Sequence, residues 1–199
     1  MDSYYTIGQE GMAEFKDRGS KFMAYAFPCN SADVFKKRLQ ELKKEHPKAV
    51  HHCFAYRIGT DGNTFRSSDD GEPAGTAGKP ILGQLNSKSV TDTSIIVVRY
   101  FGGTLLGVPG LINAYKSAAS MVLQVVPIIQ KPVLKKYSIH FDYTRMNEIM
   151  NIIKACNAVV IKQESQLFCD ITAGIPINRL DDFNFRIKNT ANVEIAELL

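Results

Sequence analysis

The chain has 199 residues, 45% of them hydrophobic, which is enough to bury one core or two small ones. Its formal net charge is only +4, from 24 basic and 20 acidic residues, weaker than the strongly basic balance typical of nucleic-acid-binding proteins. The longest apolar runs, at 94–101 and 121–129, are too short to span a membrane. The N-terminus lacks the basic start and apolar stretch of a signal peptide. We therefore expect a cytoplasmic globular monomer.

The first two thirds of the chain alternate between strand and helix patterns. Residues 12–16 and 21–28 alternate around Asp17–Ser20 and predict a hairpin. Ser31 predicts the N-cap of a helix that Pro47 ends. The remaining segments give strands at 50–58, 64–67 and 90–101, a turn at 61–63, and helices at 80–88 and 111–126.

The composition changes at Gln130-Lys131-Pro132, where we place a domain boundary that separates 1–130 from 131–199. Beyond it, Thr144 is the expected cap of a helix that follows the first strand. The order of patterns is strand 133–142, helix 145–156, strands 158–163 and 165–175, helix 178–189 and strand 192–198. This βαββαβ order predicts a ferredoxin-like domain, and the fold class is α+β.

The glycine-rich loop at 67–80 is a candidate phosphate site. A Walker A loop fails there, because Pro73 stands at the first glycine position and Pro80 replaces the hydroxyl residue. No GxGxxG dinucleotide fingerprint occurs either, and no cofactor is predicted. Backbone N–H groups of Gly75, Thr76 and Gly78 at a helix start remain able to attract an anion.

Three acids in this loop, Asp69, Asp70 and Glu72, raise the possibility of a metal site with His51 or His52. Adjacent histidines on a strand point to opposite faces, so at most one can face the acids. Asx turns and capping explain two aspartates beside a glycine without an ion, so no metal is predicted. The four cysteines have no CxxC spacing and are expected to be reduced, mostly buried thiols.

A second glycine-rich loop follows the strand at 90–101 and leads into a helix opened by Pro109-Gly110. It suits an anion site, and it equally suits a tight strand-to-helix connection with close packing. Arg99 ends the otherwise apolar strand, and a buried arginine requires a carboxylate or phosphate partner. An ion pair with Asp69, Asp70 or Glu72 would join the two loops.

Basic residues gather at 36–48 and around the turn at 17–20. A solvated helix face explains such a run, and a face that contacts phosphates remains open. The residues predicted for this basic face are Lys16, Arg18, Lys21, Lys37 and Lys44.

Two long motifs, RSSDDGEPAGTAGKPIL and VVRYFGGTLLGVPGLINAY, resemble the paired signatures of the IMPACT/YigZ family. Val108-Pro109 stand where many relatives carry a small residue and a glycine. The resemblance implies an N-terminal left-handed βαβ domain like the second domain of a small-subunit ribosomal protein. It implies a C-terminal ferredoxin-like domain like one of elongation factor G. Eukaryotic relatives of the N-terminal half regulate translation through protein contacts.

From this resemblance we expect a non-enzymatic protein that contacts RNA, the ribosome or a translation factor. The alternatives are an enzyme acting on a phosphorylated small molecule or nucleotide, and a protein-interaction adaptor. The expected binding cleft consists of Asp69, Asp70, Glu72, Gly75, Thr76, Lys79, Arg99, Gly102 and Gly103.

Overall fold

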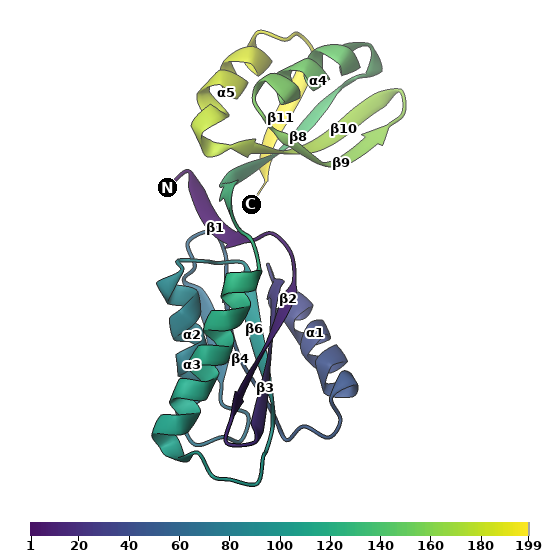
Figure 1. The fold of residues 1–199 in the computed structure, drawn as a ribbon. Helices are drawn as coiled ribbons and strands as arrows, with labels where there is room; N and C mark the ends of the chain where they lie inside the picture. The colour runs from purple at the N-terminus through teal and green to yellow at the C-terminus, as the bar shows by residue number, and fades with distance from the viewer. Residues whose placement is uncertain (199) are drawn as a thin grey trace. The chain divides into compact units, whose positions relative to one another are not determined.

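The structure is a computed structural model that describes residues 1–198, and its contacts divide the chain into two compact units. One unit spans Tyr4–Lys131; the other runs from Pro132 onward and includes Met1–Ser3 (Figure 1). The chain passes from one unit to the other between Lys131 and Pro132, and the first three residues group with the C-terminal unit.

The N-terminal unit is built on a five-stranded sheet of order β2-β3-β6-β4-β5, and all neighbours are antiparallel. Because β3 and β4 both pair with β6, they run parallel to each other and α1 connects them as a βαβ unit. The strands are β2 (Gly11–Asp17), β3 (Ser20–Pro28), β4 (His51–Ile58), β5 (Thr64–Ser68) and β6 (Thr93–Tyr100).

Helices cover both faces of this sheet (Figure 1): α1 (Ala32–Glu45) on one, α2 (Gly78–Ser87) and α3 (Gly107–Val125) on the other. Alternate residues of β6 therefore enter two different cores, with Ile95 and Val97 toward α2 and α3, and Ile96 and Val98 toward α1. Burial on both faces explains why this strand is a continuous apolar run.

Local sequence signals predict most of these elements correctly. The hairpin forms, and the Ser31 hydroxyl accepts the Val34 N–H at 3.3 Å as the N-cap of α1. Helix α3 begins at Gly107, so Pro109 lies within its first turn, where its missing N–H costs no intrahelical bond. Strands β1 (Ser3–Ile7) and β7 (Ile128–Pro132) have no counterpart among the predicted elements, and they form a two-stranded sheet.

The C-terminal unit is ferredoxin-like, as expected. Its sheet has the order β11-β8-β10-β9 and is antiparallel throughout, and both long helices pack on one face over a single core. The elements are β8 (Leu134–Asp142), α4 (Met146–Ala155), β9 (Val159–Ser165), β10 (Phe168–Pro176), α5 (Leu180–Lys188) and β11 (Val193–Leu198), with 3-10 turns at Tyr143–Arg145 and Ile177–Arg179.

The predicted cap at Thr144 is wrong. Asp142 is the capping residue: its carboxylate accepts hydrogen bonds from the Thr144 N–H (2.9 Å) and hydroxyl (2.6 Å). Since the hydroxyl of Thr144 donates to Asp142, it serves the 3-10 turn, and α4 begins directly after that turn without a side-chain cap.

The four cysteines, Cys29, Cys53, Cys156 and Cys169, are free and buried, as expected. The first two lie in the N-terminal unit and the last two in the C-terminal unit. Burial raises the pKa of Cys29 to about 11 and also raises that of Cys53. These two thiols are therefore neutral and unreactive in the folded protein.

Candidate functional site

Asp69 organises the first motif loop from within. Its carboxylate accepts three backbone hydrogen bonds, from Gly75 (2.8 Å), Ala77 (2.9 Å) and Gly78 (2.8 Å). Burial acts to raise the pKa of Asp69, but the three N–H donors outweigh it and hold the pKa below its ordinary value. The anion site expected at the start of α2 is therefore occupied by the carboxylate of the chain itself.

Asp70 fixes the strand that carries the two histidines. Its carboxylate accepts the backbone N–H of His52 at 2.7 Å, and its carbonyl oxygen lies 2.8 Å from His51 Nδ1. Because a carbonyl only accepts, Nδ1 carries a proton, and in that tautomer of the ring Nε2 is an acceptor. His52 is buried and His51 half-buried, and they lie on opposite faces as the strand pattern predicts.

The expected ion pair between the two motif loops forms through Glu72. Arg99 Nη1 donates to Glu72 Oε1 at 2.6 Å, and the Tyr115 hydroxyl donates to the same oxygen at 2.6 Å. Both charged side chains are buried, with exposed fractions of 7% for Arg99 and 3% for Glu72. Burial and the neighbouring Cys53 raise the pKa of Tyr115, so its hydroxyl stays protonated. Breaking such a pair would leave an uncompensated buried charge.

A pocket of about 490 Å³ opens above this ion pair. Its walls come from the end of β6, the loop after it, the first turn of α3 and the start of β4. The lining residues are Val50, His51, Glu72, Pro73, Arg99, Phe101, Leu105, Leu106, Gly107, Val108 and Leu111. Several of the apolar ones are also exposed at the rim, Leu105 to 82% and Val50 to 72%. The two motifs thus meet in a pocket that is mainly apolar, with a charged floor.

Of the nine residues predicted for the cleft, only Glu72 and Arg99 line this pocket. Asp69, Asp70 and Gly75 hold the first loop, and Thr76 is buried and donates to the Pro73 carbonyl at 2.7 Å. Lys79 is exposed on α2, and its charge helps to lower the pKa of Asp69.

The two remaining glycines, Gly102 and Gly103, belong to the backbone of the second loop. A Cβ at Gly102 would overlap the backbone of Gly19 and Ser20, so close packing of the β2–β3 turn explains this glycine. Gly103 has a φ of +85°.

Sequence reasoning misses Tyr115 and the apolar wall. The helical pattern places Tyr115 on a buried face, and nothing in its spacing indicates that its hydroxyl reaches Glu72. Phe101, Leu105 and Val108 fall within a glycine-rich loop. Their apolar character beside a predicted charged residue is the signal that could have indicated a pocket wall.

Some residues of the predicted basic face form ion pairs with an acidic residue, and others do not. Lys16 and Lys21 both pair with Glu14, at 3.0 Å and 2.7 Å. Lys37 and Lys44 are exposed on α1, and Arg18 is exposed at the hairpin turn.

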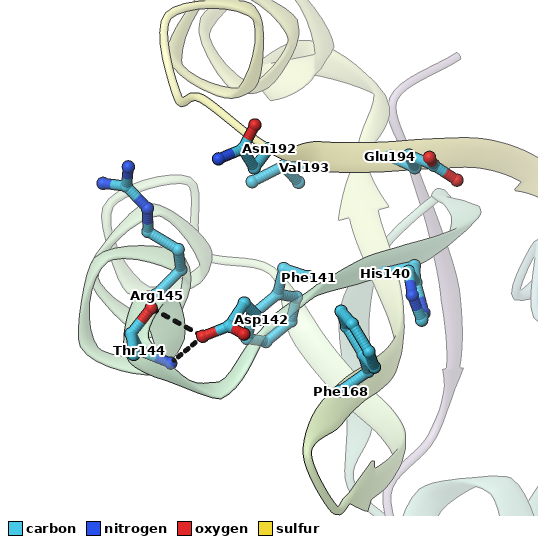
Figure 2. Close-up of a pocket in the computed structure, with 9 residues that line it drawn as sticks. All are labelled: His140, Phe141, Asp142, Thr144, Arg145, Phe168, Asn192, Val193 and Glu194. Atoms are coloured by element: carbon cyan, nitrogen blue, oxygen red, sulfur yellow. Dashed lines mark hydrogen bonds between the residues drawn. The ribbon is translucent and has the colours of Figure 1, made fainter.

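A larger pocket of about 670 Å³ lies on the C-terminal unit, as Figure 2 shows. Three of its polar residues have partners: Asp142 holds Thr144, Arg145 pairs with Glu148 at 3.0 Å, and His140 Nδ1 lies 2.8 Å from Asp170 while its ring stacks on Phe168. The charged residues of the lining are two acids, Asp142 and Glu194, and Arg145. The pocket of the N-terminal unit is therefore the stronger candidate, because it joins both motifs.

No group of three His, Cys, Asp or Glu side chains within residues 1–198 is arranged to hold a metal ion. No helix within that part of the chain is long and apolar enough to cross a membrane.

Comparison with known proteins identifies the relatives of this chain. The Impact N-terminal domain matches residues 18–123, more than half of the sequence. The chain belongs to the IMPACT family. The family member YigZ of Escherichia coli (strain K12) is 32% identical over 170 residues, which cover 84% of this chain and 83% of that protein.

Two solved structures extend the comparison. A crystal structure described as that of a hypothetical protein has a TM-score of 0.77 and 28% identity, and covers 100% of this chain and 98% of its own. The structure of Yih1, described as a two-domain translational regulator, covers 61% of this chain and 47% of its own at 27% identity and a TM-score of 0.37. The fold of the first of these structures therefore extends over the full length of this IMPACT family member.

Proposed function

We propose that this IMPACT family member is a non-enzymatic binding protein that regulates translation by docking a protein of the translation machinery in its N-terminal pocket. The observation that carries the proposal is that the carboxylates of the two motif loops are bonded within the protein. Asp69 bonds three backbone N–H groups and Glu72 bonds Arg99 and Tyr115, while the surface around them is apolar. Exposed apolar patches of this kind mark sites of protein contact.

An enzyme acting on a phosphorylated small molecule receives less support. The start of α2 is closed to phosphate, because the N–H groups of Gly75, Ala77 and Gly78 bond Asp69. The remaining donors of Arg99 lie beside the carboxylate of Glu72, which repels an anion. Cys53 lies beside the network, but burial raises its pKa and keeps it from acting as a thiolate nucleophile.

Contact with RNA or the ribosome is the second candidate, and the exposed lysines of α1 favour it. Lys37 and Lys44 face solvent, whereas Lys16 and Lys21 share the carboxylate of Glu14. An RNA contact through α1 would weaken steeply as salt rises, since each phosphate contact releases counterions.

Capture from cytoplasmic extract, with and without nuclease, tests these alternatives. The tagged full chain is compared with Leu105→Asp, with the double variant Lys37→Glu/Lys44→Glu, and with Phe65→Asp. Phe65 is exposed to 60% on β5 and does not line the pocket, so it is a matched control for an apolar-to-acid change. Captured proteins are identified by mass spectrometry.

We expect translation factors or ribosomal proteins to be captured by the unmodified chain and by Phe65→Asp, with or without nuclease. Leu105→Asp should reduce their capture at least about tenfold, because a carboxylate at the rim must be desolvated on docking. If nuclease or the double lysine change abolishes capture while Leu105→Asp does not, RNA contact replaces protein contact. Capture that includes no component of translation would contradict both.

A further inference from the structure

The charged floor of the N-terminal pocket retains hydrogen-bonding capacity that the protein does not use. Within residues 1–198 only Nη1 of the Arg99 guanidinium has a hydrogen-bond partner, the carboxylate of Glu72, and Nε is buried without one. The Arg99 side chain is exposed by only 7% and lines the pocket. Unpaired donors on a buried arginine are costly. Nε is enclosed by the protein, whereas Nη2 is not, so Nη2 is the donor that a ligand oxygen in the pocket would satisfy.

Acceptors lie on the same floor. Arg99 and Tyr115 both donate to Oε1 of Glu72, so Oε2 has no partner among the described residues. His51, which also lines the pocket, directs its protonated Nδ1 to the Asp70 carbonyl and has Nε2 left to accept. The floor thus offers acceptors as well as donors.

The first turn of α3 adds further donors. Gly107 and Val108 line the pocket, and α3 has no side-chain cap and no acidic residue in its first turn. The first N–H groups of a helix have no intrahelical partner. In α3 these are the N–H groups of Gly107 and Val108, two residues that line the same pocket as Arg99.

We infer that the pocket binds a peptide segment of a protein partner, with an apolar side chain against the walls and its backbone amide on the charged floor. An amide presents a carbonyl acceptor to the donors of Arg99 and α3, and an N–H donor to Glu72 or His51. A carboxylate would meet the uncompensated acceptors of Glu72 and His51, and an ammonium group would meet Arg99. Of these three groups, only the uncharged amide offers both a donor and an acceptor to the Arg99–Glu72 pair, whose net charge is zero.

The size and rim of the pocket indicate a protein segment as the source of the amide. A volume of about 490 Å³ exceeds that of one side chain and accommodates a few residues. Beyond it, Val50, Phe101, Leu105 and Val108 expose 51–82% of their surfaces, an apolar rim that the rest of a partner would cover. This inference rests on the proposed function and specifies the chemistry of the partner at the same site.

Three small probes with similar branched apolar bodies and different heads test the inference on the full chain. They are N-acetyl-leucine methylamide, 4-methylpentanoate and 3-methylbutylamine, titrated at millimolar concentration into the ¹⁵N-labelled protein. We expect shift changes at His51, Phe101, Gly107 and Val108 with the amide. We expect the amide to bind at least about tenfold more tightly than the other two, about the effect of one charge-assisted hydrogen bond.

Two variants separate the floor from the walls. Arg99→Met removes the donors and should reduce amide binding at least about tenfold; its folding is checked from the same spectra. Val108→Glu changes an exposed wall residue, and an acid is compatible with the first turn of a helix, so the fold should persist while binding is lost. Phe65→Glu is the matched control and should bind as the unmodified chain does.

The head-group preference decides the inference. Equal binding of all three probes, tighter binding of the carboxylate or the amine, or unchanged binding by Val108→Glu would overturn it. If no probe binds but Leu105→Asp still abolishes capture of translation components, the peptide chemistry is wrong and the docking proposal stands. If the amide binds as described but no translation component is captured, the peptide chemistry stands and the proposal that the pocket docks a protein of the translation machinery is wrong.

Discussion

At the scale of single residues, Asp69 is the side chain on which the first motif loop depends. Replacing it by alanine leaves three N–H groups without an acceptor, and we expect a loss of about 1–3 kcal/mol in the free energy of unfolding at pH 7. Urea unfolding followed by circular dichroism measures this loss. The folded pKa of Asp69 is lowered, so its contribution is present above the unfolded pKa of about 4 and is lost as pH falls through the folded value.

Asp33→Ala is the control for this prediction. Asp33 is 92% exposed and pairs with Lys36 at the surface, where such pairs contribute little. The difference between Asp69→Ala and the unmodified chain should shrink below about pH 4. An Asp69 variant no less stable than Asp33→Ala, or a difference that persists unchanged into acid, would count against the role assigned to this carboxylate.

At the scale of elements, we predict opposite effects on stability when Gly102 and Gly83 are each replaced by alanine. Gly102 contacts the β2–β3 turn so closely that a Cβ would overlap the Gly19 and Ser20 backbone, so Gly102→Ala should destabilise the protein by about 1–3 kcal/mol. Gly83 lies inside α2, and a Cβ added there would meet nothing within 4 Å, so Gly83→Ala should stabilise the protein by about 0.5–1 kcal/mol. Thermal or urea unfolding of both variants gives the two signs.

A neutral Gly102→Ala would show that the turn can move away at no cost. The glycine would then have no packing role, and the loop after β6 would keep its hydrogen bond from the Gly102 N–H to Ser20 Oγ at 3.2 Å. Since this loop carries Phe101 and Leu105, its position also determines the shape of the pocket wall.

At the scale of the whole molecule, each unit has its own sheet and its own hydrophobic core. We therefore predict that residues 132–199 fold alone. Expressed separately, they should give a dispersed ¹H–¹⁵N spectrum and a cooperative unfolding transition. A collapsed spectrum and no transition would mean that this unit requires the N-terminal one. Residues 128–132 form β7, so proteolysis near the boundary must first separate β7 from β1.

Local patterns in the sequence predict most of the architecture because hairpins, caps and helix periodicity act over a few residues. They predict the α1 cap at Ser31 and, from the burial of a lone arginine, the Arg99 ion pair. They do not predict β1 and β7, whose partners lie more than a hundred residues apart in the chain. They also favour a polar cleft, because the loops are rich in acids and glycines. The sequence does not show that the Asp69 carboxylate bonds backbone N–H groups of its own loop, or that apolar residues form the wall of the pocket.

The buried cysteines have a practical consequence. A thiol reagent reacts with a neutral, enclosed sulfur only after the surrounding structure opens, so the labelling rate measures how often that structure opens. Cys29 and Cys53 record this for one unit, and Cys156 and Cys169 for the other. Peptide-level mass spectrometry of the labelled protein therefore gives two separate opening rates, one for each unit, without any mutation.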